Sequence, residues 1–148
     1  MSKPPLRCVI DDNVALKLFF VQPLSNKADA LFARLEQDPQ ARFYIPDFFY
    51  AECASAFVNY VRLAKYPEDA ARQDMIELQA LSFQAIPTSQ LTKDALKIAF
   101  QLRISGYDAC YVALAHQLKI PLITADEKLV RATVGKHRVL FLGDDDVE

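Results

Sequence analysis

The sequence contains no run of 18 apolar residues, so it predicts no membrane-spanning helix. Its first residues, MSKPPLRCVI, lack the apolar core and cleavage site of a signal peptide, and a cytoplasmic protein is expected. Cysteine is scarce: Cys8, Cys53 and Cys110 form no CxxC pair and have no neighbouring His, which argues against zinc ligation and favours buried, reduced thiols.

Charge of one sign is also lacking, because 17 basic residues face 19 acidic ones and the net charge is −2. The whole chain therefore shows no general affinity for nucleic acid, and any phosphate binding must come from a local patch or from metal ions. The overall charge does not exclude a nucleic-acid substrate.

The 148 residues, 52% hydrophobic and 24% charged, are typical of one soluble globular domain spanning 1–148. No internal repeat, low-complexity region or linker interrupts it, and the acidic end from about residue 143 is expected to be a solvated tail. Apolar runs alternate with segments of helical periodicity, which predicts an α/β fold with three layers, α/β/α, around a central, mainly parallel sheet. The expected strands are 8–10, 43–45, 85–86, 122–124 and 139–142, and the expected helices are 14–20, 25–37, 48–65, 68–82, 107–118, 126–133 and one from Ser89 or Thr92 to 104.

Two adjacent acids, Asp11 and Asp12, follow the first apolar run, 8–10. In open α/β sheets, ligands bind at the carboxyl ends of the strands. Two carboxylates at such a place repel each other and lose solvation, unless a cation or hydrogen-bond donors offset the cost. An acid in this position is also an ordinary helix N-cap, so the pair alone leaves both interpretations open.

Three further acids fall at comparable places. Asp126 follows the predicted strand 122–124, and Asp108 precedes an apolar helix that it could simply cap. Glu52 lies four residues after Phe48 on an apolar helix face, where it needs either a salt bridge or a metal ion as its partner. A doubly wound sheet could bring these acids and Asp11 to one edge. Carboxylates without a catalytic His, Cys or Lys suit Mg²⁺ or Mn²⁺, and such ions promote phosphodiester hydrolysis.

Four segments in order resemble the motifs of the PIN-domain nucleases, and within that family the VapC-type toxins of toxin–antitoxin pairs. VIDDNVALKLF is similar to the first motif, IPDFFYAECASAF to the second, and YDACYVALAHQLKIPLITADEKL to the third and fourth. The resemblance implies an α/β/α PIN fold, Mg²⁺- or Mn²⁺-dependent cleavage of RNA, a homodimer, and a cognate antitoxin protein that folds onto the toxin.

The same resemblance assigns roles to individual residues. The polar position two residues after the first-motif acid is occupied by Asn13, where the family often has Ser or Thr. Thr124 corresponds to a hydroxyl beside the metal ligands. Asp12 does not match the motif and is expected to point away or to serve in the first turn of the following helix. The acids that match the family's catalytic and metal-binding positions are Asp11, Glu52, Asp108 and Asp126.

Two other groups of residues leave alternatives open. Aromatic residues of the predicted helical hairpin mark either a partner surface or core packing: Phe48, Phe49, Tyr50, Phe57, Tyr60 and Tyr66. Basic residues after Asp126 either hold RNA phosphates near the metals or form a solvated face: Lys128, Arg131, Lys136, His137 and Arg138. His116, in the helix that begins near Asp108, is expected to be structural or exposed.

Three other functions compete with a nuclease. A phosphoacceptor receiver domain also places paired acids after its first strand, but it needs an Asp ending a middle strand and a Lys after a late one; here Asp47 leads into a helix and no Lys follows Leu142. A haloacid-dehalogenase-type phosphatase needs acids two residues apart, where this chain has Asn13. A PIN scaffold that binds RNA or protein without catalysis would not need the intact acids.

Overall fold

The computed structural model describes residues 4–144 and contains one five-stranded sheet. The strands are ordered β3-β2-β1-β4-β5, and each pairs with its neighbours in parallel, which confirms the predicted parallel sheet. Short runs of mostly buried apolar residues form the three inner strands, β2, β1 and β4, because these are covered on both faces, whereas the edge strands β3 and β5 are less buried. The bounds are β1 (Arg7–Ile10), β2 (Arg42–Pro46), β3 (Phe83–Ile86), β4 (Leu122–Thr124) and β5 (Val139–Phe141).

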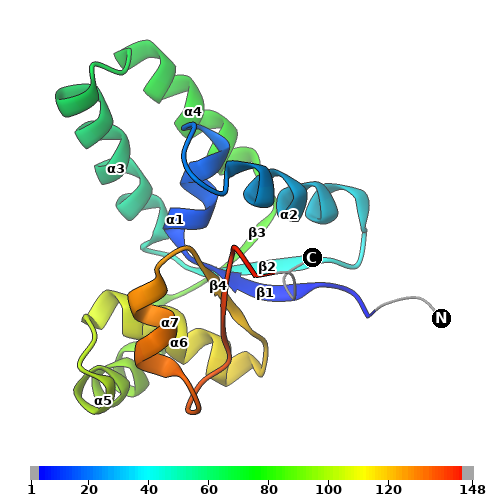
Figure 1. Ribbon diagram of the computed structural model, residues 1–148, viewed down its shortest axis with the longest axis vertical. Coiled ribbons are helices and arrows are strands. Elements are labelled where there is room, and N and C mark those ends of the chain that lie inside the picture. Colours follow the sequence, from blue (N-terminus) through cyan, green and yellow to red (C-terminus); the bar gives the residue numbers. More distant parts are fainter. Residues whose placement is uncertain (1–3, 145–148) are drawn as a thin grey trace.

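Helices cover both faces of the sheet, as the predicted three-layer fold requires (Figure 1). Figure 1 shows α1 and α2 on one side of the strands, α5, α6 and α7 on the other, and α3 with α4 as a projecting hairpin. The bounds are α1 (Asp12–Ala15), α2 (Ser25–Gln37), α3 (Phe49–Ala64), α4 (Glu68–Ala80), α5 (Thr92–Leu102), α6 (Gly106–Leu118) and α7 (Glu127–Thr133), with short 3₁₀ turns at Leu16–Leu18 (η1) and Thr88–Gln90 (η2).

The core lies on both faces of the sheet, against α6 on one face and against α1 and α2 on the other. In β1, Cys8, Val9 and Ile10 are fully buried, and in α6 seven successive residues, 109–115, are buried. A helix that is apolar on all sides must be surrounded by protein, which explains why α6 occupies the centre of its layer. The three cysteines are free and buried, as predicted.

Two local predictions were wrong. The first helix does not run over 14–20: α1 ends at Ala15 and tightens into the 3₁₀ turn η1, which directs Phe20 onto Tyr60, with the two rings stacked 3.6 Å apart. Asp47 does not cap α3. Its carboxylate accepts hydrogen bonds from the N–H (3.0 Å) and the hydroxyl of Thr88, so it joins the end of β2 to the turn after β3.

The aromatic residues of the hairpin pack internally rather than forming a partner surface. Phe49 and Phe57 are buried, and the other four are partly buried against the core. The apolar side chains that the hairpin does expose are aliphatic: Val58, Leu63 and Ile76.

Within residues 4–144, no helix combines the length and the hydrophobicity that crossing a membrane requires. The predicted acidic tail falls mostly on residues 145–148, which lie outside the described part of the chain.

Candidate active site

The strand order sets the position of the site. From β1 the chain moves outward to β2 and β3, then returns to the other side of β1 to form β4 and β5. The connections therefore reverse direction between β1 and β4, and ligands of open α/β sheets bind in the crevice at the carboxyl ends of two such strands. Asp11 directly follows β1, and Thr124 ends β4.

Asp11 is held by side chains from both strand ends. It is only 3% exposed, and its Oδ2 accepts a hydrogen bond from the Thr124 hydroxyl at 2.8 Å. The Asn13 amide nitrogen lies 3.3 Å from the same oxygen, and the Asn13 amide oxygen accepts the N–H of Ala125 at 3.0 Å. Asn13 therefore links the end of β1 to the end of β4. The side chain of Ser or Thr is shorter than that of Asn and would not reach as far.

Asp126 is tied to the same network through the backbone. Its N–H donates to the Thr124 hydroxyl at 3.1 Å, while its Oδ1 accepts the N–H groups of Lys128 (2.9 Å) and Leu129 (3.3 Å). Asp126 is thus the N-cap of α7. The cap fixes the carboxylate at the mouth of the crevice.

Asp108 does not cap its helix, contrary to the simpler alternative. The N-cap of α6 is Ser105, whose hydroxyl accepts the N–H of Asp108 at 3.0 Å. The Asp108 carboxylate is therefore not used as a helix cap, and it is half-buried in the first turn of α6.

Glu52 finds its partner in a residue that the sequence analysis did not identify. The hydroxyl of Tyr111, a side chain only 1% exposed, donates to Glu52 Oε1 at 2.7 Å. A signal was present, because Tyr111 lies three residues after Asp108 and so shares its helix face. The partner is a neutral hydroxyl, so it orients the carboxylate without neutralising its charge.

The acids raise one another's pKa values. Burial, and then the neighbouring Asp12 carboxyl, raise the pKa of Asp11 well above its usual range. Burial raises the pKa of Glu52 to about 7, and the charges of Asp12 and Asp108 add to this rise. Burial and the charge of Asp126 raise the pKa of Asp108. Asp12 lies in the first turn of α1, which was one of the two expectations for it, and its carboxyl also raises the pKa values of Asp11, Glu52 and Asp108, so it belongs to this acid cluster.

The cluster fits a divalent cation by its chemistry. Carboxylates that are buried together cost free energy, and a hard cation is the ligand that offsets it. In residues 4–144, no three His, Cys, Asp or Glu side chains converge closely enough to ligate one ion. That spacing suits Mg²⁺, which usually retains several waters and takes only one or two protein carboxylates together with substrate phosphates.

The predicted basic residues do not all lie at the acid cluster. Lys128, in the first turn of α7 beside Asp126, and the exposed Arg131, one turn further, are on its side of the sheet. Lys136 and Arg138 precede β5, at the amino ends of the strands, so the prediction that they lie near the acids is wrong. The reason is that α7 carries the chain back across the sheet before β5 begins (Figure 1).

Known proteins share both sequence and fold with this chain. Residues 8–134 match the family model described as PIN domain. Ribonuclease VapC3 of Pyrobaculum aerophilum is 25% identical over 127 residues, which are 84% of this chain and 92% of that protein.

Solved structures agree on the fold. A chain of a toxin–antitoxin complex from Klebsiella pneumoniae superposes with a TM-score of 0.63 at 18% identity, covering 91% of this chain and 97% of that one. A chain of VapBC-1 from nontypeable Haemophilus influenzae gives a TM-score of 0.64 at 17% identity, covering 94% of this chain and all of that one (100%). With the family match extending over most of its length, this chain belongs to the PIN-domain family.

Proposed function

We propose that this protein is a metal-dependent endoribonuclease that hydrolyses RNA phosphodiester bonds, and that it is the toxin of a toxin–antitoxin pair. The observation that carries the activity is the acid cluster at the reversal point of the sheet, where Asp11 is buried beside acidic neighbours that raise its pKa. Membership of the PIN-domain family and the relative named Ribonuclease VapC3 support the same reaction.

Of the acids Asp11, Asp108, Asp126 and Glu52, one or two would contact an ion directly and the others through its waters; Mg²⁺ is our first candidate and Mn²⁺ the second. A bound divalent ion supplies an activated water and neutralises charge on the phosphate oxygens. The remaining work belongs to the chain's own side chains.

Positioning comes from residues that touch the acids. The Thr124 hydroxyl and the Asn13 amide fix one oxygen of Asp11, and the Tyr111 hydroxyl fixes one oxygen of Glu52. Because Asp11 and Glu52 are held by side chains from other elements, their orientation is set before substrate arrives, which lowers the cost of reaching the reactive geometry.

Substrate binding near the acids is proposed for Lys128 and Arg131. Both are exposed on α7, which starts at Asp126, and RNA phosphates are commonly bound by such cations. Arg131 also lies 3.8 Å from Glu127, an exposed pair that is weak enough to exchange for a phosphate.

The protein partners are proposed on separate grounds. The similar Klebsiella and Haemophilus chains come from toxin–antitoxin complexes, and the exposed Val58, Leu63 and Ile76 give the hairpin an apolar surface for an antitoxin segment. The exposed Leu96 and Phe100 of α5 offer a second apolar surface for a homodimer. We expect the protein to act in the cytoplasm, where both RNA and a newly made antitoxin are present.

The activity is tested with purified protein, a fluorescent single-stranded RNA and Mg²⁺. We expect cleavage by the wild type, and loss of cleavage in Asp11→Asn and Asp126→Asn at unchanged circular dichroism. Lys65→Gln, an exposed change at the hairpin turn, is the matched control and should cleave normally. RNA binding without cleavage in every sample would instead indicate a non-catalytic scaffold.

The competing receiver function has its own test. Acetyl phosphate should leave Asp11 and Asp47 unmodified in mass spectra, because the Asp47 carboxylate is engaged by Thr88. The toxin role predicts a small reading frame directly upstream of the gene, whose product, when co-expressed, should co-purify with the protein and suppress cleavage.

A further inference from the structure

A second, basic site lies at the edge of the sheet opposite the acid cluster. A cavity of about 300 Å³ is enclosed by the end of α6 and by the loop that precedes β5. We call it the basic cavity, since its polar lining consists of His116, Lys119, Lys136, His137 and Arg138. The chain has only two histidines, and both are in this cavity.

The loop side of the cavity is held in one conformation. Gly135 takes a positive φ of 77°, which turns the chain sharply after α7. The carbonyl of Thr133 then accepts the N–H of His137 at 3.0 Å, and the carbonyl of Arg138 accepts the N–H of Leu122 at 3.0 Å. The basic side chains are therefore mounted on a braced turn rather than on a free loop.

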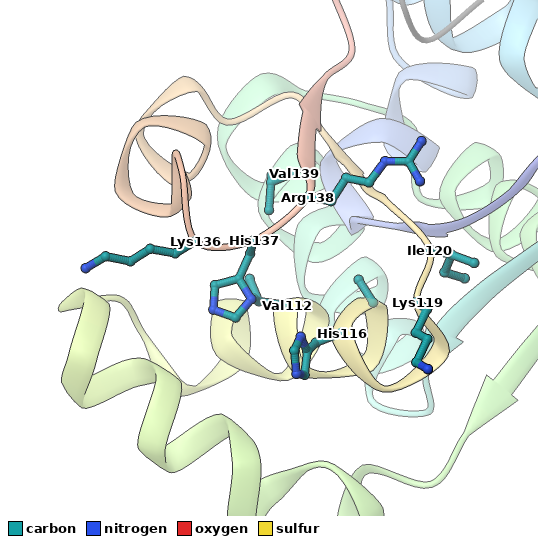
Figure 2. A pocket seen from close by; sticks show the side chains of 9 residues that line it. Val112, His116, Lys119, Ile120, Lys136, His137, Arg138 and Val139 are labelled. Atoms are coloured by element: carbon teal, nitrogen blue, oxygen red, sulfur yellow. The ribbon is translucent and has the colours of Figure 1, made fainter.

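The charges in the cavity are of one sign. Figure 2 shows the two imidazole rings close together, while the side chains of Lys119, Lys136 and Arg138 extend away from them on three sides. The rings of His116 and His137 are edge to face, with centroids 5.6 Å apart. The three cations are exposed on flexible stems, so they can turn toward an anion that binds beside the rings.

One polar atom in the cavity has no protein partner. Nδ1 of His137 is buried and makes no hydrogen bond within the described residues. Burial lowers the pKa of His137, and the charges of His116 and Lys136 lower it further. An anion would reverse both effects, because it would stabilise the protonated ring and accept the hydrogen bond of the ring N–H.

The lining decides which class of ligand fits. A transition metal could use the two imidazoles, but Lys119, Lys136 and Arg138 would repel it. A phosphate group presents several acceptor oxygens to these donors, and the cavity leaves room for the group with its waters or an attached ribose. We propose that the basic cavity binds a phosphate group, supplied either by an RNA strand that continues beyond the acid cluster or by a free oligophosphate. The first source rests on the proposed ribonuclease function, whereas the second does not.

The two histidines make the test direct. In untagged protein, the imidazole Cε1–H region of a ¹H–¹³C NMR spectrum contains two signals, and both report on the cavity. In EDTA, where no metal-dependent cleavage occurs, pyrophosphate should shift both signals saturably, and chloride at the same ionic strength should not. A short single-stranded RNA is then added to a fresh sample. Shifts that pyrophosphate competes away assign the site to the RNA backbone, and shifts by pyrophosphate alone assign it to a free oligophosphate.

Variants separate the cavity from general charge effects. Lys136→Gln with Arg138→Gln should weaken pyrophosphate binding by about tenfold, because two charged donors are lost. Arg62→Gln with Lys65→Gln removes the same charge from the exposed end of the hairpin and should leave the affinity unchanged. If neither pyrophosphate nor RNA moves the signals of the wild type, or if both double variants weaken binding equally, the proposal is overturned. None of these outcomes depends on RNA cleavage, so failure here and failure of the nuclease activity can be told apart.

Discussion

Replacing Asp11 with Asn should make the metal-free protein more stable while removing its activity. Asp11 is 3% exposed and lies beside Asp12, so ionising it in the folded state means charging a buried group next to another acid. Its pKa is raised in the folded state, so at pH 8 the unfolded state releases the Asp11 proton more readily than the folded state does. The ionised carboxylate therefore destabilises the fold above the ordinary pKa of Asp.

The size of the effect follows from what the substitution keeps and what it removes. The amide oxygen of the introduced Asn side chain can still accept from the Thr124 hydroxyl, as the Asp11 carboxylate does at 2.8 Å, so the packing and this bond survive. The charge is lost, and relieving a buried, uncompensated charge is worth about 2 kcal/mol or more. For a domain of this length, that corresponds to a rise in Tm of about 4–8 °C.

Thermal unfolding and RNA cleavage measured on the same samples provide the assay. In EDTA at pH 8, Asp11→Asn should melt above the wild type, and Asp29→Asn, the same change on the exposed face of α2, should not. Mg²⁺ should raise the Tm of the wild type and much less that of Asp11→Asn. Cleavage should fall by at least about 10²-fold, as expected when several kcal/mol of transition-state stabilisation are lost. An Asp11→Asn variant that is less stable than the wild type in EDTA, or that still cleaves RNA, would refute the reasoning.

Three further changes probe the groups around the acids. Tyr111→Phe keeps the buried ring but removes the hydroxyl that orients Glu52, so cleavage should fall about tenfold while urea unfolding stays nearly unchanged; wild-type cleavage would show that this hydrogen bond is dispensable. Asn13→Ala leaves the partly buried N–H of Ala125 without its acceptor. It should lower the free energy of unfolding by about 1–2 kcal/mol and slow cleavage, whereas an unchanged unfolding midpoint would show that the link between β1 and β4 carries no stability. In EDTA, the free energy of unfolding should fall as the pH rises from about 4.5 to about 7, because burial raises the pKa of Glu52 from 4.5 to about 7 in the folded state alone. After allowance for partial exposure, the loss is about 1–2 kcal/mol. Urea titrations in which the free energy of unfolding does not change over this pH range would contradict the burial of the Glu52 charge.

The fold was largely predictable because its signals are local. The buried strand β4 appears in the sequence as a short apolar run, and the apolar run 109–115 of α6 predicts a helix segment that is enclosed by protein. The boundaries were less predictable where a tertiary contact decides them. The predicted first helix tightens into the 3₁₀ turn η1 where Phe20 stacks on Tyr60, and the sequence of residues 14–20 contains no signal for that contact.

The candidate site divides in the same way. Asp11 and Asp126 follow their strands in sequence, so strand prediction alone places them at one edge of the sheet. The bond between Tyr111 and Glu52 joins residues 59 positions apart, and only the folded chain reveals it. The direction of α7 places Lys136 and Arg138 at the opposite edge of the sheet from the acids. That direction depends on packing, and the spacing of the basic residues in the sequence does not reveal it.

The most direct test of the central claim is RNA cleavage by the wild-type protein as its divalent metal is removed and restored. The acid cluster, with Asp11 buried among acidic neighbours, predicts that EDTA abolishes cleavage and that added Mg²⁺ or Mn²⁺ recovers it in the wild type but not in Asp11→Asn. Cleavage that persists in EDTA, or that the metal restores equally in both proteins, would contradict a metal-dependent reaction at these acids.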